Sequence, residues 1–393
     1  MTNLFTATTA AQVEEFLDRG DNIEEERDHW TTPLTLACRT GSLEVADCLL
    51  NHGADPNHRF SQSLNPIQGA AHEGHAAIVE RLVKAGADIN FNGKGETSTA
   101  LIIASREGHV DVVDCLLSLG ADTNVKGWAE TTALMEASCR GRIDVVDRLL
   151  AAGCDVNAVN RDGSTALMKA AESGRLPIVD RLVVHGAEFN LVDKNGDNAL
   201  MLCSVNGHVD VADRLISLSC ELDNQNKDGK TALMMAFEKR KTQVADLLLE
   251  AGCNVMIQDN KGSTAFMWAC RSWCLSSLDR LLALGVDLNH RDKIGMTALM
   301  ESCREARTEV VDRLLSLGCD VNVQDSSGWT ALMWACSRRR LNSIKLLLDH
   351  GADTLIRTKR GERAIDLAVG SPDTQDLLNG LILLFFHHHH HVP

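Results

Sequence analysis

A four-residue pattern returns along this chain at a fixed interval, and this repetition restricts the fold more than any other feature. Thr-Ala-Leu-Met occupies residues 132–135, 165–168, 231–234, 297–300 and 330–333, with altered copies at 198–201 and 264–267. Neighbouring copies are 33 residues apart, and the same frame continues back to residue 32 and forward to residue 363. A period of about 20–50 residues predicts a solenoid, in which each unit packs only against its neighbours.

Each 33-residue unit is predicted to form two short helices joined by a turn. The Thr of the pattern is suited to capping the first helix through its hydroxyl. The second helix carries an apolar stripe of the form V-V-x-x-L-L, as at residues 145–150, and a polar Asp/Asn-x-Gly turn follows it. A glycine that can adopt positive φ separates the two helices in the first six units, at Gly41, Gly74, Gly108, Gly141, Gly174 and Gly207.

Residues 32–57, TPLTLACRTGSLEVADCLLNHGADPN, closely resemble the consensus of the ankyrin-repeat family. The resemblance covers about ten repeats and implies an all-α solenoid with short β-turn fingers. It implies a concave groove, formed by the fingers and the first helices, that binds other proteins. The expected divisions are a capping half-repeat at 1–31, repeats at 32–362, capping helices at 363–386 and a His-rich tail at 387–393.

The chain departs from the family pattern at two repeat positions. The family's His is mostly Met here, which replaces hydrogen bonds between repeats by adaptable apolar packing and predicts softer coupling. The inter-helix Gly is lost in repeats seven to ten, where Arg240, Trp273, Ala306 and Arg339 stand. Those turns must either change geometry or accept left-handed backbone strain.

Composition narrows the class of partner. The net charge of −15 argues against nonspecific binding of nucleic acid or anionic membranes. Residues 1–200 hold 30 acidic and 17 basic side chains, so a site for an acidic partner is expected in the second half. No apolar run is long enough to span a bilayer, and the first residues lack the pattern of a secretory signal. The 13 Cys show no paired spacing, which favours reduced thiols in a cytoplasmic or also nuclear protein.

Short matches to enzyme motifs do not extend to working sites. Gly229-Lys230-Thr231 ends like a P-loop but lacks its first Gly and a preceding strand. His72 and His75 have the wrong spacing for a zinc-binding helix, and most other His and Cys recur at fixed repeat positions, which indicates a scaffold role. We therefore predict no enzyme activity, no catalytic residue, no cofactor and no metal. The recurrent Asp-Arg pairs of the second helices are interpreted as ion pairs between neighbouring repeats.

Aromatic and basic residues gather in repeats eight to ten. Trp268, Glu301 and Trp334 share a repeat position that borders the groove in the family, and arginines follow three or four residues later on the same helices. Trp, Arg and Met are enriched at interface hot spots. The alternative is that the Trp rings pack between repeats and the Arg side chains are ordinary surface. The candidate partner-binding residues are Trp268, Arg271, Trp273, Met296, Glu301, Arg304, Trp329, Trp334 and Arg338.

The resemblance also implies a modification, because in animal ankyrin proteins an asparaginyl hydroxylase can hydroxylate the Asn of an L-x5-D-V/I-N pattern. Asn90, Asn157 and Asn322 fit that pattern, and a turn-stabilising role explains them equally well.

The sequence as a whole predicts a monomeric, non-enzymatic scaffold that binds an acidic and apolar protein segment, with neither nucleic acid nor membrane as partner. A substrate-recruiting arm of a ligase or phosphatase complex and a mechanical spacer remain the alternatives.

Overall fold

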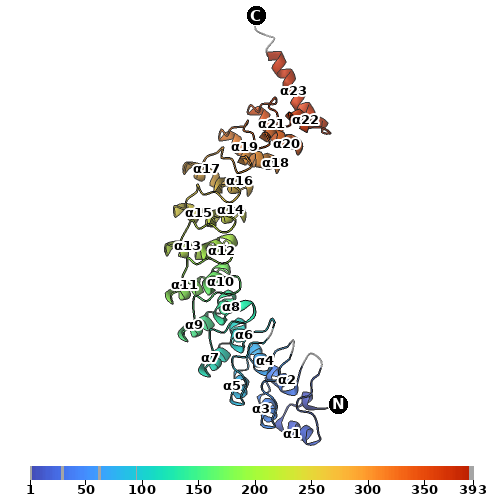
Figure 1. Cartoon of the computed structure of the whole chain (residues 1–393), viewed down its shortest axis with the longest axis vertical. Coiled ribbons are helices and arrows are strands. Elements are labelled where there is room, and N and C mark those ends of the chain that lie inside the picture. Colours follow the sequence, from blue (N-terminus) through green and yellow to red (C-terminus); the bar gives the residue numbers. More distant parts are fainter. Residues whose placement is uncertain (1, 28–30, 61–62, 94, 389–393) are drawn as a thin grey trace. The chain divides into compact units, whose positions relative to one another are not determined.

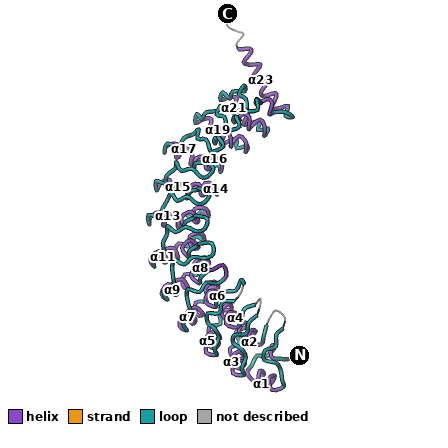
Figure 2. The backbone as a smooth tube through the Cα atoms, viewed as in Figure 1, coloured by secondary structure: helices purple, strands orange, loops and turns teal. Residues whose placement is uncertain are grey.

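The computed structural model describes residues 2–27, 31–60, 63–93 and 95–388, with side chains as far as residue 380. This part of the chain forms 23 α-helices and two 3-10 helices, and its only strand-like pairing is one isolated bridge between Arg27 and Thr31. The chain divides into two compact units, Met1–Lys194 and Asn195–Pro393. The predicted all-α solenoid is confirmed (Figures 1 and 2).

Unit 1 stacks two layers of helices. The first helices of its repeats pack one on the next, and so do the second helices, with α1 placed against α3 at the start of the second layer. The elements are η1 (Leu4–Thr6), α1 (Ala10–Asp18), α2 (Pro33–Thr40), α3 (Leu43–Asn51), α4 (Pro66–Glu73), α5 (Ala76–Lys84), α6 (Ala100–Glu107), α7 (Val110–Ser118), η2 (Trp128–Glu130), α8 (Ala133–Arg140), α9 (Ile143–Ala151), α10 (Ala166–Glu172) and α11 (Leu176–Val184).

Unit 2 continues the stack of first helices, places α13 on α15 and α19 on α21 in the second layer, and ends in α22 and α23, which pack on α20 and α21. Residues 389–393 of the predicted His-rich tail lie outside the described residues. The elements are α12 (Ala199–Asn206), α13 (Val209–Ser217), α14 (Ala232–Glu238), α15 (Thr242–Glu250), α16 (Ala265–Arg271), α17 (Leu275–Ala283), α18 (Ala298–Arg304), α19 (Thr308–Ser316), α20 (Ala331–Ser337), α21 (Leu341–Asp349), α22 (Ala364–Leu367) and α23 (Pro372–His388).

The Thr-Ala-Leu-Met pattern builds the start of each first helix. The Thr132 hydroxyl accepts a hydrogen bond from the Met135 N–H and so caps α8, as predicted. Ala133, Leu134 and Met135 are then buried. The same cap and the same burial recur at Thr165, Thr231, Thr297 and Thr330. The Met that stands where the family has His is therefore a core residue.

The turns between the two helices of each repeat show which backbone geometry repeats seven to ten adopt where glycine is missing. Gly141 has a φ of +75°, which costs a residue without Cβ little. Arg240, Trp273 and Ala306 have φ values of 58°, 61° and 61°, and Arg339 has 57°. The backbone therefore keeps its geometry and accepts left-handed strain, which is the second of the two outcomes expected from the sequence.

Two sets of polar contacts tie neighbouring repeats together. Ion pairs join the second helices, because an Arg of one repeat meets an Asp of the repeat before it, as predicted. They are Arg81–Asp47, Arg148–Asp114, Arg181–Asp147, Arg280–Asp246 and Arg313–Asp279. The projecting fingers are joined by single backbone bonds, such as Lys293 N to Lys261 O at 3.0 Å. None of the described helices combines the length and the apolarity that crossing a membrane would require.

Candidate protein-binding surface

Five of the candidate residues lie on three neighbouring first helices of unit 2. Trp268 and Arg271 are on α16, Glu301 and Arg304 on α18, and Trp334 on α20. Their 33-residue spacing places equivalent residues at the same point of successive helices, and α16, α18 and α20 pack in sequence. We call Trp268, Arg271, Glu301, Arg304 and Trp334 the first-helix row.

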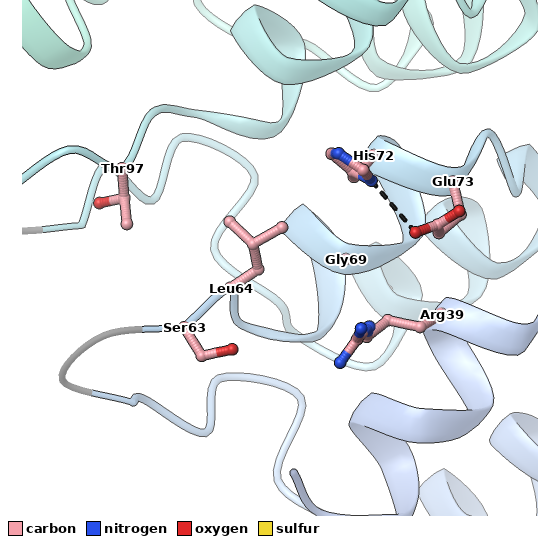
Figure 3. Close-up of a pocket in the computed structure, with 7 residues that line it drawn as sticks. All are labelled: Arg39, Ser63, Leu64, Gly69, His72, Glu73 and Thr97. Atoms are coloured by element: carbon pink, nitrogen blue, oxygen red, sulfur yellow. Dashed lines mark hydrogen bonds and ion pairs between the residues drawn. The ribbon is translucent and has the colours of Figure 1, made fainter. Parts of the chain in front are cut away.

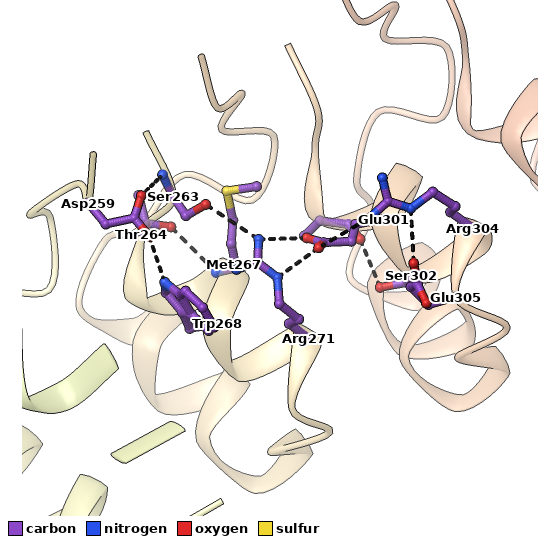
Figure 4. Close-up of polar contacts among 11 residues, drawn as sticks. Asp259, Ser263, Thr264, Met267, Trp268, Arg271, Glu301, Ser302, Arg304 and Glu305 are labelled. Carbon is purple, nitrogen blue, oxygen red and sulfur yellow. Dashed lines mark hydrogen bonds and ion pairs between the residues drawn. The ribbon is translucent and has the colours of Figure 1, made fainter. Parts of the chain in front are cut away.

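A buried carboxylate of the finger fixes each tryptophan of the row. The Trp268 indole Nε1–H donates to Asp259 Oδ2 at 3.0 Å (Figure 4). Asp259 Oδ1 accepts the backbone N–H groups of Lys261 and Ser263, both at 2.9 Å. One aspartate thus closes the finger turn and orients the indole ring at the same time.

The same arrangement recurs two repeats later. Asp325 Oδ2 accepts from the Trp334 indole at 3.0 Å, and its Oδ1 accepts the N–H groups of Ser327 and Trp329. Asp259 and Asp325 are 6% and 8% exposed, whereas both rings are half-buried. Each ring is therefore held in place while one part of it faces solvent.

Arginine and lysine extend the row between the rings. The Arg271 guanidinium lies over the Trp268 ring, 4.2 Å from its centroid, and donates two hydrogen bonds to Glu301 at 2.7 and 2.9 Å (Figure 4). Lys230 Nζ lies 4.6 Å from the centroid of the same ring. Arg304 pairs with Glu305 at 3.0 Å and stands 5.7 Å from the Trp334 centroid. Each ring of the row therefore has at least one cation beside it.

The row ends at a cavity of about 470 Å³. Trp329 and Trp334 form one wall, with ring centroids 4.6 Å apart and planes inclined by 43°. Lys359 and Arg360, both exposed, come from the next finger. The remaining lining residues are Ser326, Ser327, Thr358 and Glu362. A cavity of this size, with aromatic walls and cations at its edge, fits an apolar side chain flanked by a carboxylate.

The structure separates three of the predicted residues from the row. Met296 is 3% exposed, so its prediction as a partner contact was wrong: its side chain is packed inside the finger base. Trp273 lies in the turn between α16 and α17 and is 49% exposed, away from the finger side. Arg338 is exposed just beyond α20. Trp329 joins the row only through its contact with Trp334.

Sequence reasoning missed Asp259, Asp325 and Lys230. Both aspartates stand nine residues before the tryptophan that they orient, at a position where a turn-forming residue is expected in every repeat. An Asp at this turn position together with a Trp nine residues later in the same repeat was the sequence signal that could have predicted the contact.

A smaller cavity of about 270 Å³ opens in unit 1 at the repeat position that Trp268 occupies in repeat eight (Figure 3). Gly69 stands there and, having no side chain, leaves the space empty. A Cβ atom at this position would come within 3.1 Å of Arg39 Cγ. His72 and Glu73 lie at the edge of the cavity, with Nδ1 and Oε1 3.1 Å apart.

The asparagines of the predicted modification pattern connect one repeat to the next. Asn90 Oδ1 accepts the Asp122 N–H at 2.9 Å, and Asn322 Oδ1 accepts the Asp353 N–H at 2.8 Å. Asn157 accepts the Glu188 N–H and donates to the Gly186 carbonyl at 3.1 Å. These contacts show the turn-stabilising role; hydroxylation stays a prediction.

The 13 thiols are all free, and eight of them are buried. Burial makes a thiol a poor nucleophile, because it disfavours the thiolate. Burial raises the pKa of Cys154 and Cys319 to about 11 and that of Cys253 to about 12. Within the described residues, no three His, Cys, Asp or Glu side chains are grouped in a way that suits a metal ion.

Comparison with known proteins identifies the family. The family model of ankyrin repeats (three copies) matches residues 4–93, 34–127, 67–160, 134–226, 200–292 and 274–358, which together cover most of the chain. The chain belongs to the ankyrin-repeat family. Ankyrin repeats are a general protein–protein interaction module.

Three relatives share short stretches with the chain. The human ankyrin repeat and KH domain-containing protein 1 is 40% identical over 75 residues, 19% of this chain and 3% of that protein. The ankyrin repeat, SAM and basic leucine zipper domain-containing protein 1 of Dasypus novemcinctus is 35% identical over 94 residues, 22% and 20% of the two chains. The inactive serine/threonine-protein kinase TEX14 of Bos taurus is 31% identical over 81 residues, which are 21% of this chain and 5% of that protein. The chain thus spans a fifth or less of each relative's length.

Proposed function

We propose that the ankyrin repeats of unit 2 bind an extended segment of another protein along the first-helix row, with an apolar side chain seated between Trp329 and Trp334. The observation that carries the proposal is the pair of tryptophans held by Asp259 and Asp325. Rings that are oriented before binding lose little conformational freedom when a partner covers them, so the contact is favourable.

Charge favours an acidic segment. Among the described side chains, no carboxylate forms an ion pair with Lys359 or Arg360 at the edge of the cavity. A partner carboxylate meeting them would form charge-assisted hydrogen bonds, which are stronger than bonds between neutral groups. Arg271 is already paired with Glu301 of the next repeat, and Arg304 with its neighbour Glu305, so neither offers free charge.

Affinity purification followed by mass spectrometry tests the proposal. The variant Trp334→Ala with Lys359→Ser is compared with wild type, after circular dichroism has shown equal helix content. Leu202→Ala is the matched control, because Leu202 is half-buried at the equivalent position of α12, outside the first-helix row. A partner retained by wild type and the control and lost from the variant supports the proposal. Recovery of the same partners by all three proteins contradicts it.

The identity of the captured protein distinguishes a general scaffold from a substrate-recruiting arm of a larger complex. A catalytic subunit of a ligase or phosphatase among the lost partners indicates a substrate-recruiting arm. If wild type retains no protein at all, the spacer interpretation replaces the binding proposal.

A further inference from the structure

The four turns between the helices of repeats seven to ten form a second surface, which meets the first-helix row only at Arg271 and Arg304. We call residues 238–241, 271–274, 304–307 and 337–340 the turn surface. Each turn joins the end of a first helix to the start of a second helix, at the end opposite to the Thr cap. Their spacing of 33 residues places the four turns side by side along unit 2.

The turn surface is basic in an acidic protein. Its four turns hold nine Lys or Arg and two Glu, in a chain whose net charge is −15. The five equivalent turns of unit 1 hold five Arg and three Glu. Both glutamates of the turn surface are engaged, Glu238 with Lys230 at 3.0 Å and Glu305 with Arg304 at 3.0 Å. Positive charge is therefore concentrated along one edge of unit 2.

Several of these cations have no carboxylate partner in the described part of the chain. They are exposed and lie in the turns before α15 and α21: Lys239, Arg240, Arg338 and Arg339. The equivalent turn after repeat ten ends in Asp373, which is exposed in the first turn of α23. Four unpaired cations in one stripe favour the approach of an anionic ligand.

Trp273 is the aromatic centre of this surface. Its φ of 61° is strained for a bulky residue, at a position where six other repeats have glycine. Its ring is 49% exposed, so burial in the core does not offset that strain. The guanidinium groups of Arg240 and Arg307 lie 5.8 and 5.3 Å from its centroid, one from the repeat before and one from the repeat after. The other three turns share the left-handed backbone, so the exposed ring between two guanidinium groups, rather than the strain, marks Trp273 as a binding residue.

Arg307 adds a donor that the fold leaves unused. Its Nε is buried and makes no hydrogen bond with the described residues. A buried N–H without an acceptor costs free energy, which an anionic ligand beside Trp273 would recover.

We propose that the turn surface binds a second segment of a partner protein, one rich in carboxylates or phosphoserine, with an apolar side chain packed on Trp273. Helix layers about 10 Å apart make four turns span roughly 30 Å. An extended chain covers that length with about nine or ten residues, with anionic groups needed toward its two ends, opposite the unpaired cations of repeats seven and ten. The proposed ligand is a protein segment rather than single-stranded nucleic acid. Proteins bind single-stranded nucleic acid by stacking its bases on several aromatic rings, and Trp273 is the one Trp in these four turns.

Fluorescence anisotropy with the full chain tests this proposal. The probe is a fluorescein-labelled ten-residue peptide with phosphoserine or Glu toward both ends and one central Leu. The variants are Arg240→Gln with Arg339→Gln, and Trp273→Gly. The matched control is Arg39→Gln with Arg140→Gln, two exposed arginines in the equivalent turns of unit 1. Trp334→Ala reports whether the peptide instead binds the first-helix row.

We expect the unit 1 control to bind the peptide as well as wild type does, and Trp334→Ala to keep the salt-dependent binding that the turn variants lose. The double arginine variant should bind at least about tenfold more weakly, with an affinity that depends less on salt. Trp273→Gly should lose about threefold to tenfold in affinity while its melting temperature rises, because the substitution removes both the ring and the backbone strain. A stabilised variant that binds less well cannot owe its loss to misfolding.

Three results overturn the proposal. One is the absence of any binding that depends on the turn residues, either because wild type and the turn variants bind equally or because wild type does not bind. Another is a loss of binding in Trp334→Ala alone, which would place the peptide on the first-helix row. The third is that a ten-nucleotide single-stranded RNA binds more tightly than the peptide in the same assay and loses affinity in the turn variants. That result would make nucleic acid the ligand of the turn surface.

Discussion

Arg271 lies between an aromatic ring and a carboxylate: its guanidinium is 4.2 Å from the Trp268 centroid and donates two hydrogen bonds to Glu301 of the next repeat. The contact joins α16 to α18 through side chains that are 24% and 14% exposed. Arg106 and Glu136 occupy the same two repeat positions in unit 1, where their closest ion-pair distance is 3.3 Å and Ile103 stands at the position of Trp268. The chain therefore contains the same bridge with and without tryptophan.

A double-mutant cycle at this bridge should measure its contribution to stability. We expect Arg271→Ala and Glu301→Ala to be coupled by about 1 kcal/mol in the free energy of unfolding, because the pair is bidentate and partly buried. The Arg106→Ala and Glu136→Ala cycle should give a smaller value, about 0.5 kcal/mol, because that pair is longer and lacks the ring. Urea denaturation measures both. Equal coupling energies in the two cycles would show that the Trp268 ring adds nothing.

Glycine should stabilise the left-handed turns of unit 2. Ala306→Gly is expected to raise the free energy of unfolding by about 0.5–1 kcal/mol, since the strain that φ of 61° imposes on alanine exceeds the entropy that glycine loses. Ala251→Gly is the control, because Ala251 caps α15 with a φ of −73° and the same exchange there should destabilise. Thermal unfolding of the two variants should shift in opposite directions. A shift of the same sign in both would contradict the strain.

Removing the finger aspartate should free the tryptophan that it holds. Asp259→Ala leaves two backbone N–H groups and the Trp268 indole without their acceptor, so we expect a loss of about 1–3 kcal/mol in stability. Asp259→Asn keeps one carbonyl oxygen for the turn and turns an amide toward the indole, so it should lose less than half as much. Urea denaturation, followed by circular dichroism, compares the two. Equal losses would mean that the indole bond and the turn are not held by separate oxygens.

The sequence was sufficient for the fold because each repeat makes the same local contacts. The Thr cap, the buried Ala-Leu-Met and the Asp–Arg ion pairs all depend on spacing within 33 residues or on the next repeat. The positive φ of Trp273 and Ala306 was one of two outcomes that the sequence left open, and the structure shows that neighbouring repeats impose the turn geometry even where glycine is missing.

The site was harder to predict because side-chain exposure depends on the finger. Met296 looked suited to a partner, yet Ser98, Ser164 and Ser263 at the equivalent position are buried as well, and only an enclosed finger base explains this. The role of Asp259 could not be read from spacing alone. An aspartate that closes a turn and one that also orients an indole have the same sequence signature, and only the rotamer of the ring tells them apart.

Buried thiols should make the protein less stable in alkali. Burial raises the pKa of Cys154, Cys220 and Cys319 to about 11, above the value of about 8.5 for an unfolded chain. The folded state therefore holds these protons more tightly, and their contribution is complete below about pH 8.5 and is lost as the pH rises toward 11. Urea unfolding between pH 7 and pH 10.5 should show a falling free energy, and Cys154→Ala with Cys319→Ala should reduce that slope. The double variant leaves Asp155 and Asp320 in place, so an unchanged slope would assign the effect to other groups.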